Sequence, residues 1–232
     1  MPFENRNIII TGGAGALGAA VVAQLVAQGA HCFVPVHKKK ESPRLPGPGT
    51  VNYLDNIDLT DEPAVENFYR EVVAKGPLWA SVHTAGGFAM SKITETKKAD
   101  FHNMMAMNTL STFLCCREAV RAMRNGAGGG RIVNVAAKAA IAPVGGMLPY
   151  IASKAAVVAI TQALAEEVAP ENILVNAVLP SLMDTPANRS AMPTADFSKW
   201  PKVEQVANTI LFLISPNNTV TRSALVPVYG RS

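Results

Sequence analysis

The sequence has few charged residues and few cysteines, and each shortage excludes a class of protein. Charged residues make up 16% of the 232 residues and hydrophobic residues 49%, a balance that argues against a disordered chain. The three cysteines (Cys32, Cys115 and Cys116) stand in apolar stretches without the spacing of a metal site or a disulfide framework. We therefore expect no metal, and buried thiols in a reducing, cytoplasmic compartment.

Targeting segments and long apolar runs are also missing from the sequence. The N-terminal "MPFENRNIII" does not have the layout of a signal peptide, and no apolar run reaches membrane-spanning length. The formal net charge of +4 comes mostly from one run, His37–Lys40. A nucleic-acid surface needs basic residues spread along a face. We therefore expect one anionic subsite and a small-molecule partner, with no nucleic acid and no membrane.

Apolar strand-like runs alternate with segments of helical period along the whole chain. This order predicts one α/β domain over residues 1–232 with a parallel sheet. The finer expectation, a Rossmann-type doubly wound fold with seven parallel strands and helices on both faces, comes from the resemblance described below. The irregular segment 180–201 follows a strand and is long enough to be a substrate lid. The expected strands are Asn7–Ile10, Cys32–Val36, Asn52–Asp58, Leu78–Thr84, Arg131–Ala136, Leu174–Leu179 and Ala224–Tyr229. The expected helices are Ala16–Gln28, Pro63–Lys75, Asp100–Arg124, Pro149–Val168 and Val203–Ile214.

The stretch "IIITGGAGALG" (8–18) places a strand, a glycine-rich turn and a helix in succession. Glycines let a backbone approach phosphate closely, and the helix then offers free N–H groups and the positive end of its dipole. A plain strand–helix turn is the alternative, which the position in the first βα unit makes weaker. The residues expected to hold a dinucleotide here are Gly12, Gly15, Ala16, Leu17 and Gly18.

The end of the second strand, "FVPVHKKK", bears on the choice of dinucleotide. An acidic residue there binds the ribose 2′-hydroxyl of NAD, but this chain has Val36 and His37. His37 and Lys38 can hold the 2′-phosphate of NADP, so we expect NADPH rather than NADH, with a solvated lysine run as the alternative. Asp58 in "NIDLTD" is expected at the adenine amino group, or else as a simple helix cap.

Motifs spread over almost the whole chain occur in an ordered series. They are "TGGAGALG" (11–18), "DLTD" (58–61), "TAGG" (84–87), Asn108 in "MAMNTL", "GGRIVNVAA" (129–137), "YIASK" (150–154) and "ILVNAVLP" (173–180). Together they resemble the short-chain dehydrogenase/reductase family. The resemblance implies a doubly wound sheet of seven parallel strands, binding of NAD(P)H, and hydride transfer with a catalytic tyrosine and lysine.

The resemblance also implies roles for individual residues. Tyr150 would donate a proton, and the cation of Lys154, four residues later on one helix face, would lower the pKa of that phenol from about 10. Lys154 would also hold the nicotinamide ribose, and Asn108 a water linking Lys154 to solvent. The alternatives are a surface Tyr–Lys pair and an ordinary helix asparagine. By the same resemblance, the remaining residues that would bind the cofactor are Leu59, Ala85, Gly86, Pro180 and Thr185.

The chain departs from the family pattern at several positions. The family's third glycine is Ala16 here, and its catalytic serine, thirteen residues before the tyrosine, is Ala137. Both departures resemble the dihydropteridine reductase branch, as does the segment "LPSLMDTPANRSAMPTADFSKW" (179–200). That branch ends its second strand in aspartate, prefers NADH and lacks the helix asparagine, so His37 and Asn108 depart from it in turn.

Ala137 bears directly on the substrate. Losing one donor to a developing oxyanion costs roughly 3–4 kcal/mol, so a carbonyl reductase is expected to keep a hydroxyl there. A quinonoid dihydropterin spreads its charge over ring nitrogens and a distant oxygen. We therefore expect an NAD(P)H-dependent reductase that transfers hydride to an electrophilic heterocycle such as quinonoid dihydropteridine. The alternatives are a general carbonyl/quinone or 3-oxoacyl-type reductase, which Asn108 favours, and a catalytically silent NADP-binding sensor.

Aromatic and methionine side chains make adaptable walls for a flat ring. Those expected to line the substrate site, together with Ala137, are Phe88, Met147, Met183, Phe197 and Trp200; the alternative is that several pack the lid onto the body. Helices 100–124 and 149–168 carry small outward residues, among them Ala152 and Ala155. Family members pair through these helices, so we expect a homodimer or homotetramer.

Overall fold

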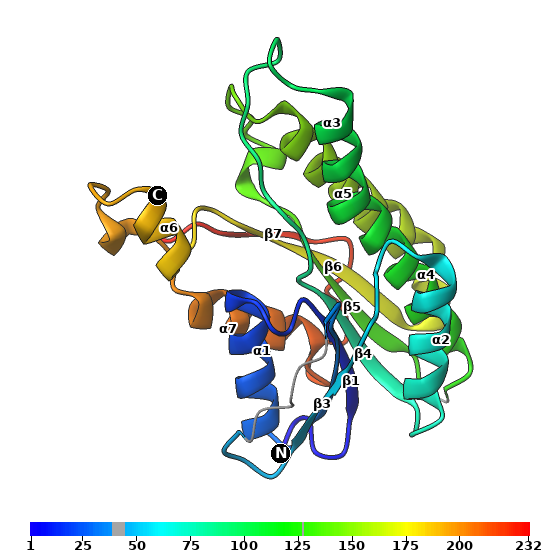
Figure 1. Ribbon diagram of the computed structural model, residues 1–232. Helices are drawn as coiled ribbons and strands as arrows, with labels where there is room; N and C mark the ends of the chain where they lie inside the picture. Colours follow the sequence, from blue (N-terminus) through cyan, green and yellow to red (C-terminus); the bar gives the residue numbers. More distant parts are fainter. Residues whose placement is uncertain (39–44, 127) are drawn as a thin grey trace.

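The computed structural model describes all residues except 39–44 and 127 and contains one seven-stranded parallel sheet (Figure 1). The strand order is β3-β2-β1-β4-β5-β6-β7, which confirms the doubly wound fold class. The strands are β1 (Asn7–Thr11), β2 (His31–Pro35), β3 (Thr50–Leu54), β4 (Leu78–His83), β5 (Gly130–Val135), β6 (Ile173–Pro180) and β7 (Leu225–Val228).

The third strand ends earlier than expected. It stops at Leu54 instead of Asp58, because Asn56 adopts a left-handed backbone (φ 61°) that no strand can continue through. Asp58 therefore stands in the turn before the next helix. Of the basic run His37–Lys40, Lys39 and Lys40 lie outside the described residues.

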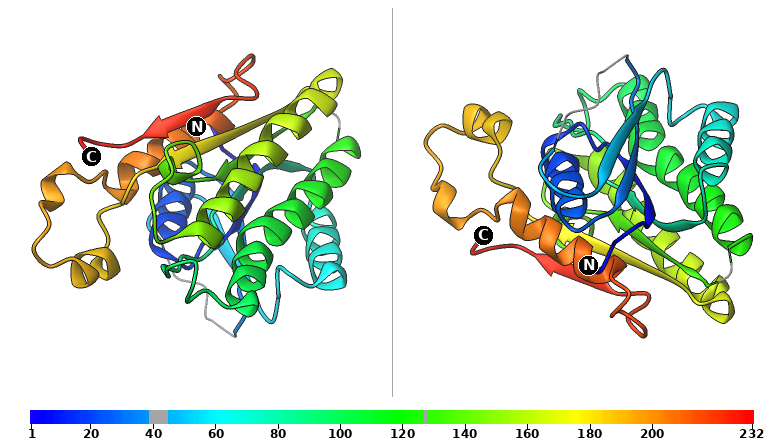
Figure 2. Two further views of the ribbon diagram at one scale, coloured as in Figure 1. Left: turned by 90° about the horizontal axis from the view of Figure 1, so that it is seen from above. Right: turned by 90° about the horizontal axis from the view of Figure 1, so that it is seen from below.

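Two layers of helices cover the sheet, with α1 and α7 on one face and α2, α4 and α5 on the other (Figure 2). The helices are α1 (Ala16–Ala27), α2 (Glu62–Val73), α3 (Lys98–Met104), α4 (Ser111–Arg124), α5 (Leu148–Glu167), α6 (Pro186–Ala191) and α7 (Val203–Ile214). A π-helical turn, η1 (Met105–Leu110), joins α3 to α4, and short 3₁₀ turns are η2 (Lys138–Ala140), η3 (Ala169–Glu171) and η4 (Phe197–Lys199). The expected single helix Asp100–Arg124 is thus three segments.

The strands consist of continuous apolar runs because both faces of the sheet are buried. In β1 all residues are buried: Ile8 and Ile10 pack into the core under α1 and α7, and Ile9 packs into the core under α2 and α4. Successive side chains of a strand point to opposite faces, so one short run serves both layers. The sheet therefore packs between the two helical layers through both of its faces.

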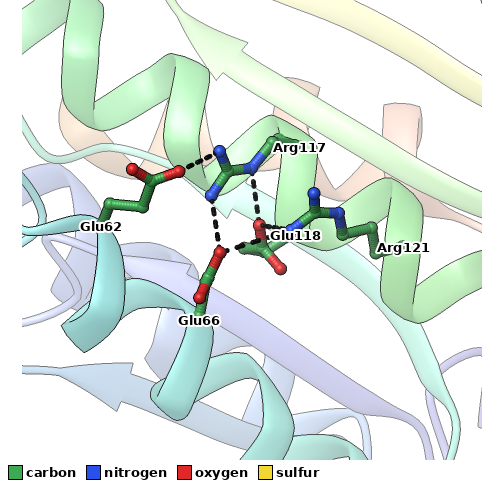
Figure 3. Close-up of polar contacts among 5 residues, drawn as sticks. All are labelled: Glu62, Glu66, Arg117, Glu118 and Arg121. Atoms are coloured by element: carbon green, nitrogen blue, oxygen red, sulfur yellow. Dashed lines mark hydrogen bonds and ion pairs between the residues drawn. The ribbon is translucent and has the colours of Figure 1, made fainter.

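A network of ion pairs joins α2 to α4 on the surface of the molecule (Figure 3). Arg117 pairs with Glu62, with Glu66 at 3.2 Å and with Glu118 at 2.7 Å, while Arg121 reaches Glu118 at 2.9 Å. The side chain of Glu118 is only 8% exposed, so its charge depends on these two guanidinium groups. The network holds α2 against α4.

Helix α5 has the length and apolar composition of a membrane span, contrary to the expectation that no run reaches that length. One such helix is weak evidence for a membrane, because the core helix of a soluble protein passes the same test. In this fold α5 packs against β6 and η1 and carries the buried Lys154. Its apolar character is accounted for in part by that packing.

A buried chain of polar side chains links the sheet to its helices. His83 Nε2 lies 2.8 Å from Ser81 Oγ, which lies 2.8 Å from the Tyr69 hydroxyl. His83 Nδ1 lies 2.7 Å from Asn134 Oδ1, and the Asn134 amide donates to Thr161 Oγ1 at 2.9 Å. Because Asn134 Oδ1 can only accept, Nδ1 carries a proton. Burial lowers the pKa of His83 to about 4.

The depressed pKa of His83 predicts a loss of stability in acid. An unfolded histidine takes up a proton near pH 6.5 whereas folded His83 does so near 4, so stability falls as the pH decreases between those values. Between pH 6.5 and 5 this loss is about 2 kcal/mol. Urea unfolding of the wild type and of His83→Gln at several pH values measures it. Equal pH slopes for the two proteins over that interval contradict the prediction.

Candidate active site

The glycine turn after β1 packs directly against the loop after β4. Gly12 has φ 67°, and a Cβ there would lie 2.6 Å from the backbone nitrogen of Ala85. A Cβ on Gly18 would lie 2.3 Å from the carbonyl oxygen of Gly12. Only glycine fits at both positions. The turn therefore exposes its backbone without side chains in the way, as the glycines in the sequence predict.

Helix α1 begins immediately after this turn and presents its N-terminus at the carboxyl edge of the sheet. Gly15 is the N-cap and offers no side chain to the first turn, which also contains no acidic residue. The first N–H groups of the helix, from Ala16, Leu17 and Gly18, have no partner within an α-helix. Free amides and the positive end of the dipole suit a diphosphate.

A cavity of about 560 Å³ lies beside the glycine turn. Six of the residues expected to bind the cofactor line it together: Gly12, His37, Asp58, Leu59, Ala85 and Gly86. Seven lining residues were not expected from the sequence, namely Pro35, Ile57, Thr60, Asn103, Ala106, Met107 and Ser111. The cavity thus brings together the ends of β1 and β2, the turn before α2, the loop after β4 and one face of α3 and η1.

Asp58 does not cap α2, whose N-cap is Asp61; its side chain instead closes an Asx-type turn with Thr60 and also lines the cavity. Its Oδ1 accepts from the backbone N–H of Thr60 at 2.8 Å and from the Thr60 hydroxyl at 2.7 Å. These two hydrogen bonds, and to a smaller extent the charge of His37, lower the pKa of Asp58. Its ionised carboxylate is therefore held in a fixed orientation beside His37.

Tyr150 and Lys154 lie on the first two turns of α5, as expected. The Lys154 ammonium donates to the carbonyl oxygen of Val135 at 2.7 Å, and burial lowers the pKa of Lys154 to about 8. The ring of Phe88 meets that of Tyr150 edge to face, with 4.9 Å between centroids. Burial raises the pKa of Tyr150, whereas the sequence analysis expected a lowered value. The difference arises because desolvation acts on the phenol here.

Asn108 is fully buried in the π-helical turn, and its side-chain amide joins two parts of the site. Its Oδ1 accepts from the N–H of Gly87 at 2.8 Å, and its Nδ2 donates to the Gly87 carbonyl at 3.1 Å and to Ser153 Oγ at 2.9 Å. Ser153 in turn donates to the carbonyl oxygen of Tyr150 at 2.7 Å. The amide therefore positions α5 relative to the loop after β4.

Sequence reasoning missed Ser153, although its spacing offered a signal. It lies three residues after Tyr150, where a hydroxyl on a helix can reach back to a carbonyl of the preceding turn. The tight fit nearby also explains Gly86. A Cβ on Gly86 would lie 2.5 Å from Asn108 Oδ1 and 3.3 Å from Lys154 Nζ.

The predicted substrate residues fall into two groups. Ala137, 5% exposed, follows β5, and Phe88, 58% exposed, lies against Tyr150. Met147 is the N-cap of α5, and the loop beside it is held by a hydrogen bond from Ser91 N–H to the Gly146 carbonyl at 2.9 Å. Of these three residues, Phe88 contacts the ring of Tyr150, and Met147 stands three residues before Tyr150 at the start of α5.

The second group packs within the segment 181–201, which stands out from the body around α6 (Figure 1). Trp200 is 9% exposed and its ring centroid lies 4.9 Å from that of Phe197, while Met183 packs against the core under α7. Thr185, expected at the cofactor, caps α6 by accepting from Asn188 N–H at 3.2 Å. Pro180 is the last residue of β6.

Known proteins match this chain along nearly its full length. The family model for short chain dehydrogenase matches residues 6–196. Carbonyl reductase family member 4 of Danio rerio is 31% identical over 223 residues, covering 90% of this chain and 91% of that protein.

Solved structures share the fold closely. A short-chain type dehydrogenase/reductase from Mycobacterium ulcerans has a TM-score of 0.91 and 26% identity, covering 100% of this chain and 90% of that one. A variant of ElxO with NADPH bound has a TM-score of 0.89 and 25% identity, covering 97% of this chain and 98% of that one. With its glycine turn, its cavity and its Tyr150–Lys154 pair, the chain belongs to the short-chain dehydrogenase/reductase family and is an NAD(P)H-dependent oxidoreductase.

Proposed function

We propose that the protein reduces an electrophilic heterocycle of the quinonoid dihydropteridine type with NADPH. The observation that carries this proposal is Ala137. It stands directly after β5 and has a methyl group where the family has a hydroxyl, while Tyr150 and Lys154 remain in place. Only the hydroxyl that would stabilise a localised oxyanion is missing from this site. Its absence supports an acceptor on which no localised oxyanion forms.

The residues of the site divide the work of binding and proton transfer. The amides of α1 and the glycine turn at Gly12 would hold the diphosphate of the cofactor. The Lys154 ammonium uses one of its three N–H bonds on Val135, so two would remain for ribose hydroxyls. The bound reduced nicotinamide supplies a hydride, and therefore both electrons. Tyr150 supplies the proton that completes the reduction. The phenolate so formed regains its proton from solvent, and Lys154 stabilises its charge.

The acceptor class follows from where negative charge develops. A ketone concentrates it on one oxygen, and losing one donor there costs roughly 3–4 kcal/mol. A conjugated quinonoid ring spreads it over several atoms, so the cost of the methyl group of Ala137 is smaller. The exposed ring of Phe88 beside Tyr150 offers a flat apolar surface for such a ring.

The runner-up is a general carbonyl, quinone or 3-oxoacyl-type reductase. The identity of 31% with a carbonyl reductase family member and the presence of Asn108 favour it. A silent NADP-binding sensor needs no proton donor, so the retained Tyr150 argues against that reading.

The preference for NADPH rests on the end of β2. His37 is exposed and lines the cavity, Lys38 follows it, and the acidic residue typical of NAD sites is absent from Pro35 to Lys38. Two basic side chains at this edge suit a 2′-phosphate.

We also propose that the protein is a cytoplasmic homodimer or homotetramer. Met107, Leu110 and Phe113 are between 40% and 48% exposed on η1 and α4, and α5 beside them is only a third buried although apolar. A second copy covering α4 and α5 removes this apolar surface from water. The buried thiols of Cys32, Cys115 and Cys116 suit a reducing compartment.

Replacing Tyr150 by phenylalanine removes the proton donor and keeps the ring that packs against Phe88. We expect NADPH-dependent reduction of quinonoid dihydropterin to fall by about 10²-fold or more, with an unchanged Kd for NADPH. Cofactor absorbance measures turnover and cofactor fluorescence measures binding. Tyr53→Phe, on the edge strand β3, is the control. Full activity in Tyr150→Phe refutes the proposed role.

Replacing Ala137 by serine restores the missing hydroxyl. We expect turnover of simple ketones and diketones to rise about 10- to 100-fold, because a localised oxyanion gains a donor, while turnover of quinonoid dihydropterin changes little. The matched control is Ala136→Ser, since the preceding side chain points to the opposite face of the strand end. A wild type that reduces ketones well and ignores the pterin establishes the runner-up instead.

Replacing His37 by aspartate places an acid at the end of β2. The carboxylate repels a 2′-phosphate and accepts from a 2′-hydroxyl, so the ratio of kcat/KM for NADPH to that for NADH is expected to fall by about tenfold or more. Lys38→Gln should lower the same ratio less, since it removes a charge without adding an opposite one. An unchanged ratio in His37→Asp shows that the 2′-phosphate binds elsewhere.

A further inference from the structure

Tyr150 is held in place by its backbone and its ring, and not by its hydroxyl group. Within the described part of the chain its phenol oxygen makes no hydrogen bond, and its ring meets that of Phe88 with 4.9 Å between centroids. A proton donor needs a free hydroxyl for its acceptor. The position of this phenol therefore depends on how firmly the start of α5 is fixed.

The start of α5 has no cap of its own that would fix it. The N-cap Met147 makes no side-chain hydrogen bond to the first turn, which also contains no acidic residue. The first N–H groups of a helix have no partner within the helix, so an uncapped first turn frays readily. Because Tyr150 lies in this turn, a contact from outside the helix is needed to keep it ordered.

Ser153 receives such contacts from the π-helical turn η1. It is 0% exposed, and its hydroxyl accepts from Asn108 Nδ2 at 2.9 Å and donates to the carbonyl oxygen of Tyr150 at 2.7 Å. The hydroxyl of Thr109, the next residue of η1, donates to the carbonyl oxygen of Ser153 at 3.0 Å. Two successive residues of η1 thus hold Ser153, and Ser153 holds the backbone of Tyr150.

Lys154 is fixed independently of these contacts. Its ammonium donates to the carbonyl oxygen of Val135 on β5 at 2.7 Å. The loss of the Ser153 hydroxyl therefore leaves the anchor of Lys154 in place and acts mainly on Tyr150. Proton transfer and cofactor binding can for this reason be measured apart from each other.

We propose that Ser153 is a positioning residue for proton transfer, which passes the fixed position of the Asn108 amide to the backbone of Tyr150. In the step concerned, the O–H bond of Tyr150 breaks and its proton goes to the acceptor atom that carries the negative charge after hydride transfer. A misplaced phenol slows this step, because a displacement of about 1 Å is enough to slow a reaction strongly. The inference goes beyond the proposed function, since it concerns the proton donor and applies to any acceptor.

Thr161 provides a matched control on the same helix. It is also 0% exposed, and its hydroxyl also accepts from an asparagine amide, that of Asn134 at 2.9 Å, and donates to a carbonyl of the preceding turn, that of Val157 at 2.8 Å. Ser153→Ala and Thr161→Val therefore remove the same two kinds of hydrogen bond, one pair at the proton donor and the other pair away from it.

The test measures turnover with NADPH and either quinonoid dihydropterin or diacetyl. In Ser153→Ala, kcat should fall about 10- to 100-fold, with an unchanged Kd for NADPH and a larger solvent deuterium isotope effect on kcat, because proton transfer becomes slower. Ser153→Thr should regain most of kcat, since a threonine hydroxyl on a helix can make the same bond. Thr161→Val should keep the kcat and the isotope effect of the wild type, although its Tm falls as well.

Amide hydrogen exchange gives a measurement that needs no acceptor. The amides of residues 151–154 bond to the carbonyl groups of the first turn, so they should exchange faster in Ser153→Ala and at the wild-type rate in Thr161→Val. Unchanged exchange in Ser153→Ala overturns the inference, even if the wild type reduces neither acceptor. Unchanged kcat in Ser153→Ala, or equal losses of kcat in both variants, also overturns it. A wild type that reduces diacetyl and not the pterin removes the proposed acceptor alone, and the variants are then compared with diacetyl.

Discussion

The side-chain amide of Asn108 is the contact on which the geometry of the site depends. Its oxygen accepts a hydrogen bond from the N–H of Gly87, and its nitrogen donates to the carbonyl oxygen of Gly87 and to the hydroxyl of Ser153 on α5. The loop after β4 and the start of α5 belong to different layers and are far apart in the sequence, and a backbone hydrogen bond from Ser91 to Gly146 joins them further along the loop. A buried amide whose oxygen and nitrogen are both bonded fixes their distance, because an unpaired polar atom there costs free energy.

Burial sets the electrostatics of this centre. Desolvation lowers the pKa of Lys154 to about 8 and raises that of Tyr150, so both groups favour their uncharged forms more than they do in water. A neutral phenol is the form that can donate a proton. The bonded carbonyl oxygen of Val135 nevertheless stabilises the ammonium, so that Lys154 remains a cation at neutral pH. Near pH 7 the phenol of Tyr150 is therefore neutral and Lys154 is mostly protonated, the two states that the proposed reduction needs.

Patterns that are local in the sequence predicted the fold and the glycine turn well. Each strand is a short apolar run, and the turn at Gly12 and Gly18 needs glycine for steric reasons that any such turn shares. The π-helical turn could not be predicted, because its residues have ordinary helical propensity and only the buried amide of Asn108 explains its position. The contact between Lys138 and Ser232 was likewise beyond reach, since Ser232 lies 94 residues away along the chain. The hydrogen bond of Ser153 was predictable in part, because its hydroxyl bonds a carbonyl only three residues earlier on the same helix.

The methyl group of Ala137 has two explanations, relaxed selection on an idle site or adaptation to a different acceptor. An idle site has no use for a buried lysine whose ammonium costs desolvation energy, nor for a glycine at position 86 that keeps space beside it. The retained lysine and glycine therefore support the proposal that the methyl group of Ala137 reflects the choice of acceptor. Charge that is localised on one oxygen of the acceptor needs a hydroxyl in contact with it, whereas charge that is delocalised over a ring loses less when that hydroxyl is absent.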